Sequence, residues 1–391
     1  MKPSSIREIL KLTQGGEVIS FAGGLPAPQL FPTRALAEAA AKVLAERGAQ
    51  ALQYSTTEGV GPLRDWLAAS FGLASRDGVQ IVSGSQQGLD LVAKVYFDEG
   101  DLVAVAAPTY MGALRAFDAY GVRYAPVATD AEGLVPDSLE AAFRAGAKML
   151  YLIPNFDNPT GASLALARRH ALVALARRYG VPILEDDPYG ELRFEGERLP
   201  QLRELAPELV IHAGTFSKTV TPGLRLAWLV AAPEALAPIV RAKQAADLHS
   251  SSLLQLVAYE LLHSGLLDEQ LERVRAYYRS QREHMLGALE RHFPAGVAWT
   301  RPQGGMFLWV TLPAGLNATE LALEAVREGV AYVPGEAFFA AGGGENTLRL
   351  SYSVASPEQI ETGVARLGAL FARAAVNAGK NAAESAPETS A

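Results

Sequence analysis

Residues 83–88, Ser-Gly-Ser-Gln-Gln-Gly, combine small residues with side chains that donate hydrogen bonds. This loop follows an apolar run typical of a strand and precedes a helical pattern. The N-terminus of a helix offers free backbone N–H groups to an anion, and small residues let a ligand approach the backbone closely. Ser85 and Gln86 add two side-chain donors. The loop therefore fits a phosphate group, although a serine at a helix start is also an ordinary N-cap.

Three further loops carry polar residues in unusual density. Residues 155–161 contain Asn158-Pro159-Thr160-Gly161, which would also make an ordinary turn. Residues 185–189 are Glu-Asp-Asp-Pro-Tyr, and adjacent acids repel one another unless a cation or a proton partner lies nearby. Residues 214–225 place Lys218 among small and hydroxyl-bearing residues, with Arg225 seven positions later. A solvated acidic loop and a surface lysine are the simpler interpretations, so no single loop identifies a function.

Short apolar runs between residues 79 and 231 predict the element that positions these loops. The runs cover residues 79–82, 102–106, 122–127, 148–153, 181–184, 209–212 and 226–231, and helices are expected at 85–97 and 164–178. Nearly continuous hydrophobic strands separated by helices indicate a mostly parallel sheet covered on both faces. Ligands of such sheets bind at the carboxyl ends of the strands. The polar loops follow strands, so we look for the site at that edge.

The section after about residue 253 predicts a second, smaller α+β domain. Helices are expected at 266–292, 320–328 and 357–373, and strands at 306–312 and 348–352. We expect a large domain over residues 30–285 and a small domain formed by residues 1–29 together with 286–373. Residues 374–391 are rich in Ala, Glu, Ser and Pro and are predicted to be a disordered tail.

Composition narrows the class of protein. The chain has 391 residues, of which 49% are hydrophobic, so it can bury a large core. A net charge of -7 gives no basic footprint for nucleic acid. The absence of cysteine excludes disulfides, thiolate metal sites and a cysteine nucleophile, and no metal is predicted. The N-terminus does not resemble a signal peptide and no apolar run has membrane-spanning length, so we expect a cytoplasmic protein without a membrane partner.

The order of the loops resembles the class I aminotransferases of fold type I, which use pyridoxal 5'-phosphate (PLP). The shared motifs are Ser-Gly-Ser-Gln-Gln at 83–87, Asn-Pro-Thr-Gly at 158–161, Asp-x-x-Tyr at 186–189, and Ser217-Lys218 with Arg225. Further matches are Phe-Ala-Gly-Gly-Leu-Pro at 21–26, Leu-Gln-Tyr-Ser at 52–55, Gly-Gly-Met-Phe at 304–307 and Asn-Thr-Leu-Arg-Leu-Ser-Tyr at 346–352. The likeness covers nearly the whole chain. Within the family it is nearest to bacterial 2-aminoadipate aminotransferases and the related kynurenine/aminoadipate aminotransferases.

The resemblance implies the fold and a set of residues around the cofactor ring. The fold would be α/β, with a mostly parallel seven-stranded sheet in a large domain and a smaller α+β domain. Lys218 would hold PLP as a Schiff base and later carry a proton, which requires a lowered pKa. Asp186 would pair with the pyridinium nitrogen and keep the ring an electron sink. Tyr189 and Asn158 would hydrogen-bond the phenolic oxygen, and Tyr110 would stack on the ring.

The resemblance also implies a phosphate site and a shared dimer site. The phosphate would be held by Ser85, Gln86, Thr215, Ser217 and Arg225. Tyr54 matches a tyrosine that reaches the phosphate from the neighbouring subunit in the family. The chain is therefore expected to form a homodimer with shared active sites.

Substrate residues are implied in the same way. Arg349 would bind the α-carboxylate of the substrate, and the backbone at Gly24 would help to close over it. Ser-Ile-Arg-Glu-Ile-Leu at residues 5–10 matches a mobile N-terminal helix whose arginine meets the distal carboxylate in aminoadipate-specific relatives. Arg7 would play that part here, and Ser4 would assist it. A solvated charge beside Glu8 is the simpler interpretation of Arg7.

The implied activity is a ping-pong transfer of an amino group between an L-amino acid and a 2-oxo acid such as 2-oxoglutarate. The expected donors are 2-aminoadipate, glutamate, leucine and aromatic amino acids, with a place in lysine biosynthesis. Fold type I also hosts lyases and decarboxylases, which the cofactor loops alone do not separate. An aminotransferase-like regulator would need a DNA-binding module, and about 20 residues before the motif at 21–24 are too few for one.

Overall fold

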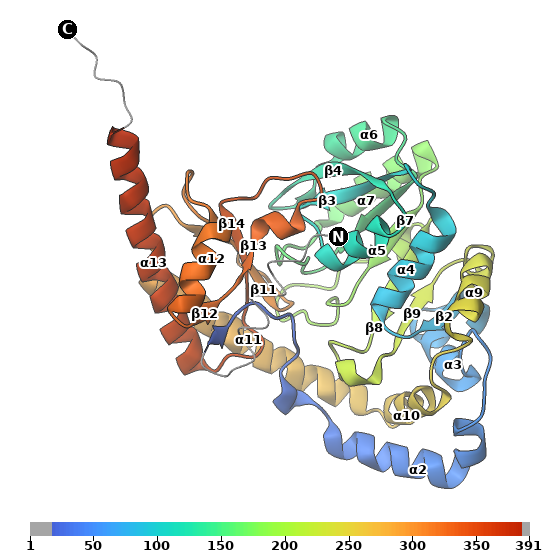
Figure 1. Ribbon diagram of the computed structural model, residues 1–391. Coiled ribbons are helices and arrows are strands. Elements are labelled where there is room, and N and C mark those ends of the chain that lie inside the picture. The colour runs from blue at the N-terminus through green and yellow to red at the C-terminus, as the bar shows by residue number, and fades with distance from the viewer. Residues whose placement is uncertain (1–17, 385–391) are drawn as a thin grey trace.

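The computed structural model describes residues 18–384 and shows two packed parts (Figure 1). A large sheet with helices on both faces forms one part. The other part contains a smaller sheet and the C-terminal helices, and the long helix α11 (Leu266–His292) runs beneath both (Figure 1). Within residues 18–384 no helix is both long and apolar enough to cross a membrane.

The large sheet has eight strands among the described residues, in the order β2-β9-β8-β7-β6-β3-β4-β5. The strands are β2 (Val79–Val82), β3 (Leu102–Ala107), β4 (Arg123–Asp130), β5 (Gly133–Leu134), β6 (Met149–Leu152), β7 (Ile183–Asp186), β8 (Val210–Thr215) and β9 (Ala227–Val230). Pairing is parallel from β4 through β3, β6 and β7 to β8, and β9 runs antiparallel to both β8 and β2. All seven predicted strands are present, so the mostly parallel sheet is confirmed. The eighth, β5, is a two-residue edge strand that turns back along β4 and is too short to leave a sequence pattern.

Successive residues of the central strands enter different cores, because side chains alternate between the faces of a sheet. On β6, Tyr151 joins one core while Leu150 and Leu152 join another. The first core is covered by α4 (Ser85–Tyr96) and α5 (Met111–Asp118), and the second by α6 (Pro136–Arg144) and α7 (Leu166–Tyr179). The predicted burial on both faces is thereby confirmed.

Other helices complete the large part. α9 (Pro233–Asp247) packs on α4, and the short α8 (Leu202–Leu205) lies against β8 and α7. A third core lies around β2 and β9, where α2 (Thr33–Ala51), α3 (Gly61–Ser70) and α10 (Ser252–His263) pack together. α10 and α2 lie side by side at the lower edge of Figure 1.

The smaller part contains a four-stranded antiparallel sheet in the order β10-β11-β14-β13. Its strands are β10 (Ala298–Trp299), β11 (Phe307–Thr311), β13 (Val333–Pro334) and β14 (Thr347–Ser351), and its helices are α12 (Ala318–Arg327) and α13 (Pro357–Glu384). The N-terminal strand β1 (Ile19–Ser20) pairs with β12 (Val330–Ala331), so residues near the start of the described chain join this part. Helix α11 passes through residue 285, where we placed a domain boundary; the boundaries stay a prediction.

The predicted start of a disordered tail at residue 374 is wrong, because α13 continues to Glu384. Alanine and glutamate favour helix, and these residues extend a helix whose first part is buried against α11. Residues 385–391 lie outside the described chain.

Candidate active site

The polar loops after β2, β6, β7 and β8 lie at one edge of the large sheet, since these four strands run in the same direction. Their side chains meet residues of the smaller part there. Arg349 of β14 bonds Asn158 from the loop after β6. Lys218 from the loop after β8 bonds the backbone at Gly24. The loops that the sequence singled out therefore form one site between the two parts.

Lys218 has the properties of a reactive amine. Its Nζ donates to the carbonyl oxygen of Gly24 at 2.8 Å. Desolvation, with the positive charges of Arg349 and Arg225 nearby, lowers the pKa of Lys218 to about 8. Roughly a tenth of such amines are uncharged at pH 7, and the uncharged amine is the form that attacks a carbonyl carbon or accepts a proton.

Asp186 ends β7 with a side chain that lacks a partner on one oxygen. The residue is 3% exposed, and Tyr151 donates its hydroxyl to Oδ2 at 3.0 Å. Oδ1 is buried with no hydrogen-bond partner among the described residues. Burial raises the pKa of Asp186 to about 7, against the lowering effect of the Tyr151 bond. A buried acceptor without a donor is costly, and a cationic N–H group brought by a ligand would satisfy it.

Arg349 is a buried cation with no carboxylate partner in the part of the chain that the structure describes. Nη1 donates to Asn158 Oδ1 at 2.7 Å and Nη2 to the Ala22 carbonyl oxygen at 2.6 Å. Its guanidinium lies 4.2 Å from the ring centre of Phe307, and Nε has no partner. Desolvation lowers its pKa to about 10. A buried, unpaired guanidinium at a site edge suits a substrate carboxylate.

Asn158 extends this chain of contacts toward Tyr189. Its Nδ2 donates to the Tyr189 hydroxyl at 3.5 Å, and both residues are buried. Burial, with the neighbouring Tyr110 next in effect, raises the pKa of Tyr189. Tyr110 precedes α5, and its pKa is raised by burial and by the negative charge of Asp186. The structure thus brings Lys218 and Arg349 together with the predicted ring-binding residues.

The predicted phosphate residues surround the N-terminus of α4. Gly84 has φ 96°, and a Cβ there would lie 2.2 Å from Arg225 Nη2, so only glycine fits. Arg225 Nη2 reaches the Ser83 carbonyl oxygen at 3.4 Å. Ser85 and Gln86 begin α4, and Gln86 Nε2 donates to the Gly112 carbonyl oxygen at 2.7 Å, so one of its two N–H groups is already engaged. In the neighbouring loop the hydroxyls of Thr215 and Ser217 bond each other at 2.9 Å.

Three predicted residues remain untested by the structure. Tyr54 is 79% exposed and contacts His249, with ring centres 5.8 Å apart, and none of its hydrogen bonds or ring contacts joins the site residues above. Arg7 and Ser4 lie outside the described residues. The structure therefore does not test the distal-carboxylate role.

Sequence reasoning missed Tyr151, the hydrogen-bond donor to Asp186. Its signal is a tyrosine in the otherwise aliphatic run of β6. Tyr151 pairs with Leu184, so it faces the same side of the sheet as Asp186, two residues further along β7. It also missed Asp157, whose pKa burial raises to about 7 and whose Oδ2 accepts the Thr160 hydroxyl at 2.9 Å. Asp157 looked like one polar residue of a turn.

Comparison with known proteins identifies the family. Residues 18–367 match the class I and II aminotransferases, and the chain belongs to that family. It is 52% identical over 373 residues to a 2-aminoadipate transaminase of Thermus thermophilus, with 94% of each chain covered. It is 42% identical over 379 residues to aromatic-amino-acid aminotransferase 1 of Thermococcus litoralis, covering 94% of this chain and 91% of that one.

The fold agrees with a solved relative. The α-aminoadipate aminotransferase LysN of T. thermophilus, in complex with N-(5'-phosphopyridoxyl)-L-leucine, superposes with a TM-score of 0.91 at 49% identity, covering 96% of both chains. The protein is a PLP-dependent transaminase, and the predicted family, fold, enzyme class and cofactor are confirmed. The site fits this cofactor, because Asp186 Oδ1 lacks the donor that a ring N–H provides and Lys218 has a lowered pKa.

Proposed function

We propose that this aminotransferase exchanges amino groups between 2-aminoadipate or glutamate and 2-oxo acids such as 2-oxoglutarate, with Lys218 as its catalytic residue. The observation that carries the residue assignment is the partly buried amine of Lys218, with its pKa lowered to about 8 at the carboxyl edge of the sheet. When bound, PLP supplies an electron-poor ring that accepts the electron pair left at the substrate's Cα. The support for the substrates is the likeness to relatives named for 2-aminoadipate.

The ring would be held from three sides. Asp186 would accept a hydrogen bond from the ring nitrogen through Oδ1, and keep that nitrogen protonated. Tyr189 and Asn158 would bond the phenolic oxygen, and Tyr110 would cover one face of the ring. At the other end the phosphate would be held by Ser85, Gln86, Thr215, Ser217 and Arg225.

The substrate would be oriented by its α-carboxylate. Arg349 would bind that carboxylate, which restores a counter-charge to a buried guanidinium. Lys218 would then take the proton from Cα, as an amine with a pKa near neutral can both accept and return a proton. Gly24 lies where a side chain would fail to fit, since a Cβ there would lie 2.9 Å from the Phe307 ring.

Borohydride reduction tests the assignment of Lys218. We expect it to fix the cofactor to one peptide, the one that contains Lys218, as read by mass spectrometry. Lys218→Ala should carry no adduct. Lys148→Ala is the matched control, because Lys148 forms an ion pair with Asp101 and precedes β6, at the end of that strand opposite to the site loop. An adduct on another lysine would overturn the assignment.

We also propose a homodimer with shared sites. Large apolar side chains are exposed near Tyr54, and such side chains mark interfaces when they gather on one face; the exposed fractions are 72% for Leu52, 79% for Tyr54 and 52% for Leu248. Mixing inactive Lys218→Ala chains with inactive Tyr54→Ala chains should restore about a quarter of the wild-type sites, since half the dimers are mixed and one site in each is intact. No recovery after demonstrated subunit exchange would place Tyr54 in its own chain's site.

Substrate choice and location complete the proposal. Arg7, assisted by Ser4, would bind the distal carboxylate of 2-aminoadipate and glutamate. Arg7→Ala should then lower kcat/KM for these donors by roughly 10–100-fold, from a lost charged hydrogen bond, while kcat/KM for leucine holds or rises. The ratio between donors is the measurement, and an equal fall for both would assign Arg7 to stability. A cytoplasmic location and a place in lysine biosynthesis belong to this proposal.

A further inference from the structure

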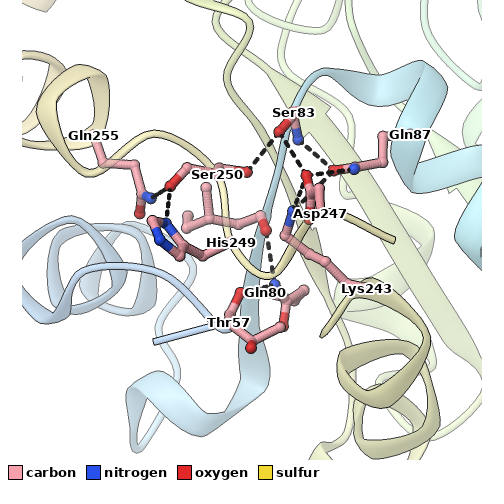
Figure 2. A network of polar contacts seen from close by, with 10 residues as sticks. Thr57, Gln80, Ser83, Gln87, Lys243, Asp247, His249, Ser250 and Gln255 are labelled. Atoms are coloured by element: carbon pink, nitrogen blue, oxygen red, sulfur yellow. Dashed lines mark hydrogen bonds and ion pairs between the residues drawn. The ribbon is translucent and has the colours of Figure 1, made fainter. Parts of the chain in front are cut away.

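A polar network lies directly beside residues 83–86, which we call the phosphate loop (Figure 2). Its centre is Lys243 of α9, whose side chain is 0% exposed. Lys243 Nζ donates to Gln87 Oε1 at 3.0 Å and to the two carboxylate oxygens of Asp247 at 2.7 and 2.9 Å. Burying an ammonium group costs free energy, whereas burying an apolar side chain is favourable. Desolvation accordingly lowers the pKa of Lys243. Apolar residues at such a position would often give equal stability, so stability alone does not account for this lysine.

The partners of Lys243 hold the loop at Ser83, the residue before Gly84. Gln87 Oε1 accepts the backbone N–H of Ser83 at 2.7 Å, and Gln87 Nε2 donates to Asp247 Oδ2 at 2.7 Å. The Ser83 hydroxyl lies 3.2 Å from Asp247 Oδ2 and 2.9 Å from the Ser250 hydroxyl. Both donors of Ser83 are therefore fixed by groups that contact Lys243 or Asp247. Ser85 and Gln86 follow two and three residues later.

The chain after Lys243 makes a strained turn. Leu248 has φ 62° and ψ -64°, and the N–H of His249 donates to the Asp247 carbonyl oxygen at 2.7 Å. This γ-turn is rare for a residue with a β-carbon, and such strain persists only where the surroundings determine it. Here Asp247 is held on one side by Lys243 and Gln87. The γ-turn at Leu248 thus fixes the direction in which the chain leaves α9.

His249 joins the other side of the turn to the segment that carries Tyr54. Its Nδ1 donates to the Ser250 carbonyl oxygen at 2.8 Å, and its Nε2 accepts the Ser55 N–H at 3.2 Å. The Tyr54 ring meets the His249 ring edge-on. One turn therefore connects the phosphate loop to the segment at residues 54–55.

We propose that Lys243 is a positioning residue for the cofactor phosphate: by holding Gln87 and Asp247 against Ser83, it keeps the N-terminus of α4 and its loop in the anion-binding geometry. The inference rests on the proposed phosphate site at Ser85 and Gln86. Donors that are already oriented lose little freedom when they bind an anion, so a fixed loop binds more tightly than a mobile one. Because the same network reaches Tyr54, the phosphate loop and that segment are held as one unit.

The test compares two ligands that differ only in the phosphate, PLP and pyridoxal. The variants are Lys243→Met and the double variant Lys243→Met with Asp247→Leu, which replaces the pair by apolar groups and avoids a buried unpaired charge. Lys148→Met, which breaks the ion pair with Asp101, is the matched control. Each enzyme is freed of cofactor, and the dissociation constants are read from the absorbance of the bound ligand. Thermal unfolding of each variant is followed in parallel.

We expect both Lys243 variants to bind PLP at least roughly 10-fold more weakly, as is typical when a residue that orients a ligand-binding group is lost. Their affinity for pyridoxal should be nearly unchanged. Should Lys243→Met fail to fold, Ser83→Ala removes only the hydroxyl at Asp247 and Ser250 and should shift the same ratio by less. Equal weakening of PLP and pyridoxal, or no weakening of PLP in the folded double variant, would overturn the inference. A wild-type enzyme that binds both ligands with equal affinity would instead overturn the phosphate site itself.

Discussion

Two neighbouring carboxylates on β7 point to opposite faces of the sheet and have opposite electrostatic environments. Glu185, 0% exposed, is fully partnered: Oε1 accepts the Leu202 N–H at 2.7 Å, and Oε2 accepts the Arg203 N–H at 3.2 Å and lies 3.0 Å from His212 Nδ1. Burial alone would raise its pKa, but these bonds, led by that from His212, hold the pKa of Glu185 below its ordinary value. Asp186 has one donor, Tyr151, and a raised pKa.

The difference separates an acid whose bonds are complete within the protein from the acid that we propose binds the cofactor ring. The Glu185 carboxylate joins the start of α8 to β8, and its bonds are complete within the protein. Asp186 keeps one oxygen unpaired at the edge where Lys218 and Arg349 lie. An unsatisfied buried acceptor that the fold does not need is expected where a ligand completes it. Mutating each acid should therefore change different properties.

The largest effect is expected for Asp186→Ala. Without the carboxylate the ring nitrogen loses its proton partner, so turnover should fall by about 10³–10⁴-fold, equivalent to about 4–5 kcal/mol. The free energy of unfolding of the cofactor-free protein should stay level or rise, because a buried acid with one partner is removed. Single-turnover rates with glutamate and urea unfolding measure the two quantities. Near-normal turnover would refute the assigned role.

Glu185→Ala should give the reverse pattern. It leaves His212 and the N–H groups of Leu202 and Arg203 without their acceptor, so the free energy of unfolding should fall by about 3–5 kcal/mol. The turnover per folded molecule should remain close to that of the wild type. Urea unfolding and a count of active sites by cofactor absorbance separate the two effects. If this variant lost turnover and kept its stability, the contrast between the two faces of β7 would be wrong.

The contrast also shows what the sequence could predict. Continuous apolar runs at β6, β7 and β8 indicated parallel strands, and strand direction then placed Lys218 and Asp186 at one edge. The different environments of Glu185 and Asp186 depend on the register between β7 and β8 and on α8, which no local pattern specifies. Tyr151 was missed for the same reason, since its bond to Asp186 joins residues 35 apart on adjacent strands. The reversal of β9 and the short β5 likewise follow from pairing across the sheet.

A third prediction concerns pH in the cofactor-free protein. The pKa of Asp186 is about 7 when folded and near 3.9 when unfolded, so the folded state binds more protons between these values. The free energy of unfolding should therefore fall as pH rises from about 4 to about 7, by at most about 1.4 kcal/mol per pH unit. Glu185, with its lowered pKa, contributes stability that is present above its unfolded pKa and is lost as pH falls through its folded pKa.

Asp186→Asn and Glu185→Gln each remove one of these contributions. Urea unfolding from pH 4 to pH 8 should show a shallower fall in stability for Asp186→Asn than for the wild type. The comparison of variants cancels Asp157, whose pKa is also raised to about 7. A pH profile for Asp186→Asn that equals the wild-type profile would show that Asp186 is ionised throughout this range.

The smallest effect is expected for Tyr151→Phe, which removes the single donor to Asp186 and keeps the ring. A lost hydrogen bond to a charged group costs about 1.5–3 kcal/mol. Only part of that cost reaches the ring through Asp186, so turnover at high pH should fall by only about 5–10-fold. Because the Tyr151 bond lowers the pKa of Asp186, its loss should raise that pKa further. More Asp186 is then protonated at pH 6 than in the wild type, so turnover should fall more at pH 6 than at pH 8.

Tyr352→Phe is the matched control, since Tyr352 is also 0% exposed and donates to the Gly304 carbonyl oxygen at 3.0 Å. That variant loses a buried hydrogen bond that does not involve Asp186, and its turnover should change equally at both pH values. The ratio of turnover at pH 8 to turnover at pH 6 is the measurement, and a ratio for Tyr151→Phe equal to that of Tyr352→Phe would limit Tyr151 to packing.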